Sequence, residues 1–133
     1  MQSGGCQCGN ARYEIDGEPV YSALCHCADC RASSGAPVVA WTAVREDQLT
    51  LRSGELSTYE GRNGSSRQFC PNCGTGLFFR NQNTLPGLVD VQAATLDDPA
   101  GSPPQLQVQC AERLSWMTEL GSLPEFERYP GPR

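Results

Sequence analysis

Apolar and polar positions alternate over short stretches of this chain, and no stretch keeps one pattern for long. Nine short runs alternate or are rich in β-branched side chains, as expected of strands with one buried face. Turn-forming pairs such as Asp16-Gly17 and Asn63-Gly64 separate them. The runs are residues 12–15, 20–26, 37–42, 49–52, 57–60, 66–70, 75–80, 88–93 and 106–109. Many short strands divided by turns predict an all-β domain.

Residues 111–120 follow a different pattern. Leu114, Met117 and Leu120 recur every three residues, and Gly121 stands where helices commonly end. We therefore expect one short C-terminal helical segment. Residues 97–104 are rich in Asp and Pro and are expected to form an exposed loop. No internal repeat appears, so the 133 residues predict a single domain over 1–133, with this loop and the C-terminal tail inside it.

Composition narrows the possible functions. The chain has 14 Gly, 10 Pro and 38% hydrophobic residues, which predicts a modest core that metal cross-links would help to hold. It has ten arginines, no lysine and a net charge of −5, which argues against nucleic-acid binding and excludes Schiff-base chemistry. No stretch could span a bilayer and the N-terminus has no signal-peptide pattern, so we expect no membrane association and a cytoplasmic location.

In that reducing compartment, paired cysteines bind metal more often than they form disulfides. Seven of the eight cysteines fall into three clusters. The last, Cys70-Pro71-Asn72-Cys73-Gly74, has the spacing of a zinc knuckle, in which one tight turn supplies two sulfurs. A knuckle needs a partner pair. The clusters Cys6-Gln7-Cys8 and Cys25-His26-Cys27-Ala28-Asp29-Cys30 both qualify on chemistry.

Seven cysteines divide naturally into one site of four and one of three, which predicts two zinc ions per chain. Four cysteines close a structural zinc site, whereas three leave a position for water or substrate. The compact set Cys25, Cys27 and Cys30 is the candidate for the open site. Alternatively, His26 or Cys110 closes this site and both metals are structural. His26 is otherwise a candidate proton relay, and Cys110 is expected to be a half-buried free thiol.

Taken together, these motifs resemble the glutathione-dependent formaldehyde-activating enzyme family, which includes the centromere protein V type of domain. The resemblance covers most of the chain. It rests on three stretches, Gly4-Gly5-Cys6-Gln7-Cys8-Gly9-Asn10-Ala11-Arg12-Tyr13, the cluster Cys25–Cys30 with Arg31, and Arg67-Gln68-Phe69-Cys70-Pro71-Asn72-Cys73-Gly74-Thr75-Gly76-Leu77. Residues 108–116 also resemble endings seen in the family. One departure is that many members carry a histidine near the C-terminus, and residues 105–108 contain none.

The resemblance implies a zinc-stabilised β-tent of small antiparallel sheets. It also implies that Cys6, Cys8, Cys70 and Cys73 hold the structural zinc and that Cys25, Cys27 and Cys30 hold the second. The implied activity is that of a carbon–sulfur lyase, joining glutathione to formaldehyde as S-hydroxymethylglutathione. Because three thiolates make zinc a weak Lewis acid, delivery of a thiol is favoured over activation of water.

The implied partners are a small thiol and an aldehyde. Recognition of an anionic thiol needs a cation in this acidic protein, and Arg31 and Arg67 are the candidates. The chain is expected to be a monomer or homodimer. A rival hypothesis is a non-catalytic binding module with two structural metals and an aromatic surface drawn from Trp41, Tyr59, Phe78, Phe79 and Trp116. A redox-active dithiol protein is a third.

Overall fold

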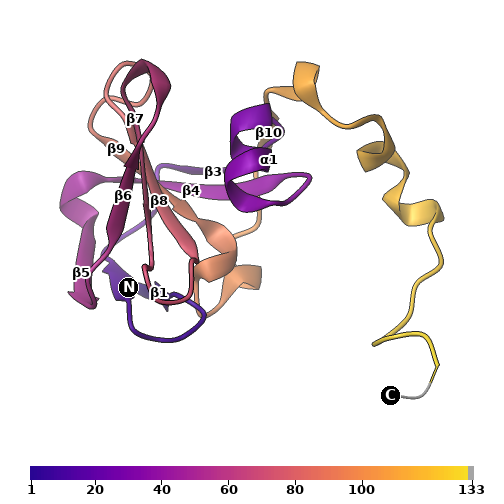
Figure 1. Cartoon of the computed structure of the whole chain (residues 1–133), viewed down its shortest axis with the longest axis horizontal. Helices are drawn as coiled ribbons and strands as arrows, with labels where there is room; N and C mark the ends of the chain where they lie inside the picture. The colour runs from indigo at the N-terminus through magenta and orange to yellow at the C-terminus, as the bar shows by residue number, and fades with distance from the viewer. Residues whose placement is uncertain (132–133) are drawn as a thin grey trace.

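The computed structural model describes residues 1–131, which form two β-sheets with short helices at their ends (Figure 1). The first sheet has the strand order β1–β2–β5, with β1 at Gln2–Gly5, β2 at Arg12–Ile15 and β5 at Leu49–Ser53. The second has seven strands in the order β10–β3–β4–β9–β8–β7–β6. These are β3 Tyr21–Cys25, β4 Val39–Arg45, β6 Ser57–Glu60, β7 Ser65–Phe69, β8 Gly76–Asn81, β9 Leu88–Gln92 and β10 Leu106–Val108.

The predicted all-β fold of small sheets is confirmed. All nine predicted strands are present, with ends shifted by a few residues, and they pair antiparallel except where β10 runs parallel to β3. The strand β1 was not predicted, because its sequence Gln-Ser-Gly-Gly has no strand-forming pattern. A Cβ at Gly4 would overlap the ring of Tyr13 on the neighbouring strand. Close packing between strands, rather than strand propensity, therefore selects this glycine.

Two helical features differ from expectation. A seven-residue helix, α1 (Ala28–Ser34), was not predicted; it begins after Cys27, whose Sγ caps the backbone N–H of Cys30, and ends before Gly35. The expected C-terminal helix consists instead of 3-10 turns, η5 (Cys110–Glu112) and η6 (Ser115–Ser122). An apolar repeat of three residues matches the three residues per turn of a 3-10 helix.

The two sheets enclose the main core between them. Val44, Val89 and Val91 of the larger sheet pack with Tyr13 and Ile15 of the smaller one. The opposite face of the larger sheet carries a second buried cluster made of Cys25, Cys30, Val39 and Trp41. This second face is the one that holds the functional side chains described below.

The C-terminal segment runs away from the sheets after β10 (Figure 1). Large apolar side chains on it are exposed, among them Trp116, Leu120, Leu123 and Phe126. Within residues 1–131, no helix is both long enough and apolar enough to cross a membrane.

Candidate metal centres

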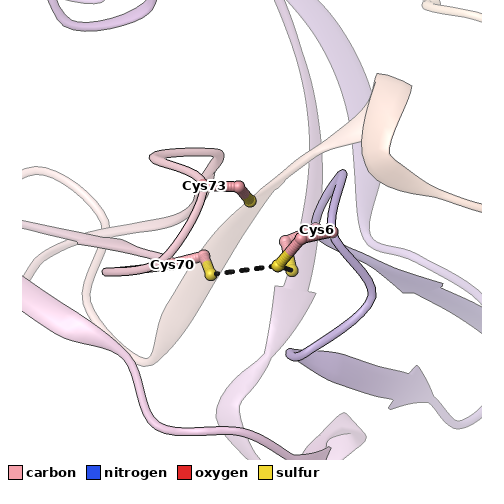
Figure 2. A group of neighbouring side chains, drawn as sticks. Cys6, Cys70 and Cys73 are labelled. Atoms are coloured by element: carbon pink, nitrogen blue, oxygen red, sulfur yellow. Dashed lines mark hydrogen bonds between the residues drawn. The ribbon is translucent and has the colours of Figure 1, made fainter.

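Two loops at one end of the sheets bring four cysteines together. Cys6 and Cys8 lie between β1 and β2, and Cys70 and Cys73 lie between β7 and β8. Their four Sγ atoms all lie within 4.8 Å of one another, with 3.5 Å between Cys6 and Cys8 and 3.8 Å between Cys8 and Cys70. Figure 2 shows the sulfurs of Cys6, Cys70 and Cys73 turned toward each other. The ligand chemistry of the residues alone did not decide which pair of cysteines lies next to the knuckle Cys70–Cys73. In the structure that pair is Cys6 and Cys8.

The two cysteine loops have the same kind of turn. Each turns back at a glycine that directly follows its second cysteine, Gly9 or Gly74, and both have φ of 83°. A Cβ at either glycine would meet no atom within 4 Å, so only the positive φ requires the residue. The N–H of Gly9 donates to the carbonyl of Cys6, and that of Gly74 to the carbonyl of Cys70. Each pair of sulfurs is therefore positioned by its own short turn.

The four-cysteine cluster fits a metal ion. A tetrahedral zinc with bonds of about 2.3 Å keeps its sulfurs about 3.8 Å apart, close to the spacing seen here. All four thiols are free. The N–H of Ala11 donates to Cys6 Sγ at 3.2 Å, and the hydrogen bond with Thr75 lowers the pKa of Cys73 to about 5. Four converging cysteines are a donor set that zinc prefers, and a bound cation would stabilise their sulfurs as thiolates.

The second cluster has three members. Cys25 ends β3, Cys27 caps α1, and Cys30 lies in the first turn of that helix. Their Sγ atoms also lie within 4.8 Å of one another. Within residues 1–131, no fourth His, Cys, Asp or Glu joins this group. This second donor set, too, could hold a metal ion, and it would leave one position without a protein ligand.

Neither alternative fourth ligand is in place. Cys110 lies outside both clusters and is exposed, so the expectation that it is half-buried is wrong. Its Sγ accepts a hydrogen bond from Arg113 at 3.1 Å. His26 is also outside both groups. The division of seven cysteines into four and three is therefore seen in the structure.

Charge in the second cluster gathers on one sulfur. Hydrogen bonds from Cys25, then from Cys27 and Arg67, lower the pKa of Cys30 to about 5 despite its burial. The same Cys25–Cys30 interaction, together with burial, raises the pKa of Cys25. Arg67 Nη2 lies 3.9 Å from Cys30 Sγ. These shifts favour the thiolate at Cys30 over the thiolate at Cys25, whereas a metal ion bound by all three cysteines would require each of them as a thiolate.

The three cysteines lie in the wall of a cavity of about 650 Å³. Its lining also includes Arg62, Arg67 and Phe79, together with residues of β3, β9 and η5. A neighbouring cavity of about 540 Å³ shares Arg62 and Arg67 and extends to Gly74 beside the knuckle. The two cavities adjoin, with the three-cysteine cluster in the wall of the larger one and Arg62 and Arg67 where they meet.

Arg67 is held at this junction by two contacts. Its guanidinium lies 4.7 Å from the centroid of the Phe79 ring, and that ring packs against Trp41 with centroids 6.0 Å apart. The structure places the other candidate, Arg31, elsewhere. Its Nε donates to the carbonyl of His26, and it lines a shallow hollow with Leu114 and Trp116 rather than either cavity.

His26 is 1% exposed and lines neither cavity. Its Nε2 lies 2.8 Å from Gln107 Oε1, and its backbone N–H donates to Val108. These contacts connect β10 to the segment that contains Cys25 and Cys27, so His26 helps to position that segment. Its role as a proton relay stays a prediction.

Among the cavity residues that the sequence did not single out, Asp90 on β9 is the most deeply buried acidic side chain. It is 8% exposed, its Oδ1 has no hydrogen-bond partner among the described residues, and it lines the larger cavity. Burial, and next the charge of Cys30, raises its pKa to about 7. The signal in the sequence was an acidic residue flanked by valines in the run Leu-Val-Asp-Val-Gln. An alternating pattern would have placed it on the opposite face from Val89 and Val91.

Comparison with known proteins shows which family this chain belongs to. The family model described as glutathione-dependent formaldehyde-activating enzyme matches residues 1–112. An uncharacterized lyase of Schizosaccharomyces pombe is 28% identical over 80 residues, which are 60% of this chain and only 58% of that relative's length. A crystal structure of a Rhodobacter sphaeroides protein shares the fold, with a TM-score of 0.62 and 24% identity over 80% of this chain and 99% of that one. The chain belongs to the glutathione-dependent formaldehyde-activating enzyme family.

Proposed function

We propose that this protein is a zinc-dependent carbon–sulfur lyase that joins, or separates, a small thiol and an aldehyde such as formaldehyde. The observation that carries the proposal is that the two cysteine clusters differ in their number of ligands. Four cysteines meet at one, whereas three meet at the other and line a cavity. The family membership and the name of the yeast relative support the lyase class. Two zinc ions per chain are part of the proposal.

Cys25, Cys27 and Cys30 would hold the reactive zinc, and Cys6, Cys8, Cys70 and Cys73 the structural one. Zinc with three protein ligands supplies an open position at which a thiol is held as its thiolate. The larger cavity, at about 650 Å³, is of the size that binds small ligands. Trp41 and Phe79 provide apolar wall beside the cluster. The site would thus keep a thiol and an aldehyde together and limit their contact with water.

Arg67 is the residue best placed to bind the carboxylate of an anionic thiol such as glutathione. It lines both cavities and stacks on Phe79, which fixes its planar guanidinium beside the cysteines. A guanidinium can bind a carboxylate through two hydrogen bonds. Arg62 lines both cavities as well, but its side chain is 87% exposed and lies 3.6 Å from Asp29. We therefore assign the main anion contact to Arg67.

The proposed function is tested by the rate of adduct formation. Formaldehyde and glutathione combine unaided, so exchange between free and adduct signals should be measured by NMR at equilibrium with and without protein. Zinc-loaded protein is expected to raise the exchange rate well above the uncatalysed rate, and protein treated with a chelator is not. Equal rates with and without zinc-loaded protein would contradict the lyase and favour a binding module with two structural metals. For such a module, Trp41 and Phe78 are buried and could not form part of the surface, while Tyr59 and Trp116 are exposed.

Replacing Arg67 with glutamine should weaken binding of an anionic thiol. A hydrogen bond to a charged group contributes about 1.5–3 kcal/mol, so KM for glutathione should rise about tenfold or more. KM for 2-mercaptoethanol, which has no carboxylate, should change by less than about threefold. Steady-state kinetics with both thiols separate these outcomes. Arg31→Gln serves as the comparison: if it raises KM for glutathione more than Arg67→Gln does, the anion contact lies with Arg31 instead.

A further inference from the structure

Asp90 occupies the centre of one row of paired residues that crosses the larger sheet. Arg67 pairs with Phe79, Phe79 with Asp90, Asp90 with Ala43, and Ala43 with Tyr21. Directly paired residues project from the same face of a sheet. That face carries the cavity, and Arg67, Phe79, Asp90 and Tyr21 all line it. The carboxyl group of Asp90 is therefore presented to the same space as the three cysteines.

The carboxyl group of Asp90 makes no contact with the described residues that would explain it as a stabilising part of the fold. It caps no helix and forms no ion pair within residues 1–131, and its Oδ1 has no hydrogen-bond partner there. The nearest cation along the row is Arg67, two strands away from Asp90. Its guanidinium lies over the ring of Phe79, which stands between them. A buried polar atom without a partner costs about 1–3 kcal/mol. At a cavity wall the missing partner is supplied by water or by a ligand that enters the cavity.

When a thiol adds to an aldehyde, the aldehyde oxygen must receive a proton. The sulfur lone pair forms the S–C bond while the C=O π pair moves to oxygen, and that oxygen must then take a proton. The thiol releases one proton on entering as thiolate, so the net change is proton transfer from sulfur to oxygen, with no redox step. In the lyase direction the hydroxyl proton leaves and the S–C bond breaks. An acid–base group within reach of the oxygen would serve both directions.

We propose that Asp90 is a catalytic residue whose carboxyl group exchanges this proton with the oxygen derived from the aldehyde. The inference rests on the proposed lyase function and adds to it the group that handles the second reactant. Burial raises the pKa of Asp90 and so favours its protonated carboxyl, the form that donates during synthesis. The other titratable or charged groups that line the cavity are Tyr21, Cys25, Cys27, Asp29, Cys30, Arg62, Arg67 and Glu112.

The first test replaces Asp90 with asparagine, which keeps its shape and removes the exchangeable acid. General acid–base catalysis contributes about 10²–10⁴-fold, so kcat for glutathione and formaldehyde should fall by that factor. KM for glutathione and the zinc content should stay near the values of the unmodified protein. Asp47→Asn is the matched control because Asp47 is exposed, pairs with Arg45 and lines neither cavity. A kcat within about threefold of the unmodified protein would overturn the proposal.

The second test guards against a loss of rate caused by altered folding. Asp90→Ala should also be slow, and formate, which matches the carboxyl group removed and exchanges a proton, should restore part of its rate. Formamide, of similar shape without an acidic proton, should not. Equal effects of the two additives would overturn the proposal. If Asp90→Asn keeps full rate while Cys27→Ser is inactive, only this inference fails; if the unmodified protein does not accelerate the reaction, the lyase function itself fails.

Discussion

Replacing Cys70 with serine is expected to abolish cooperative folding. Cys70 is 1% exposed and belongs both to the four-cysteine cluster and to the core between the sheets. Serine would remove one of four thiolates, and zinc binding contributes about 10–16 kcal/mol in small zinc domains. That is as large as the whole unfolding free energy of a typical domain, about 5–15 kcal/mol. Loss of the ion would therefore leave the chain without enough stability to hold its loops together.

Thermal unfolding followed by circular dichroism, with zinc content measured by atomic absorption, would check this expectation. The matched control is Cys110→Ser, the same chemical change at an exposed cysteine outside both clusters. Its unfolding free energy should change by no more than about 0.5 kcal/mol. Chelation should bring the unmodified protein to the state of Cys70→Ser and should leave that variant unaffected. A Cys70→Ser protein that melts like the control would contradict a structural metal at this cluster.

Replacing Cys27 with serine is expected to remove activity while leaving the fold in place. The Sγ of Cys27 accepts a hydrogen bond from the backbone N–H of Cys30 at 3.3 Å, which caps α1. Serine is a preferred N-cap residue, so its Oγ can keep this bond and preserve the helix. It is a much poorer zinc ligand than a thiolate. The variant should retain about one zinc per chain, and its rate should fall to that of the uncatalysed reaction.

The contrast between the two serine variants is the measurement that separates the clusters. Exchange NMR of formaldehyde and glutathione gives the rate, metal analysis gives the zinc content, and thermal unfolding reports the fold. Cys27→Ser should lose rate and one metal with an almost unchanged melting temperature, whereas Cys70→Ser should lose the folded state. A Cys27→Ser protein that retains the full rate would refute the assignment of catalysis to the three-cysteine cluster.

Most of the secondary structure could be predicted from local patterns. The nine predicted strands are present because alternation of apolar and polar side chains directly encodes one buried face. The misses have tertiary causes. The strand β1 depends on the ring of Tyr13 packing where a side chain of Gly4 would stand. The helix α1 begins at a cysteine cap, and cysteine is not among the residues that ordinarily signal a helix start.

The candidate site was predictable in part. Spacing alone identified the knuckle Cys70–Cys73 and the compact set Cys25–Cys30, because ligands from one turn are close in sequence. The partner of the knuckle was not predictable from spacing, since Cys6 and Cys70 follow strands of different sheets. The exclusion of Arg31 from the cavities, and the inclusion of Asp90, also depend on which way each side chain projects.

The sequence by itself therefore determined the β-rich class, the family and the seven cysteines that form the clusters. These are carried by residues close together in the chain, whose backbone geometry is set by local turns and alternation. The family resemblance had already implied which four cysteines belong together, and in the structure they meet across two loops. Only the tertiary structure decided that the other three line a cavity and that Asp90 and Arg67 face it. Those facts depend on strand order and register, because pairing between distant strands decides which side chains share one face of a sheet.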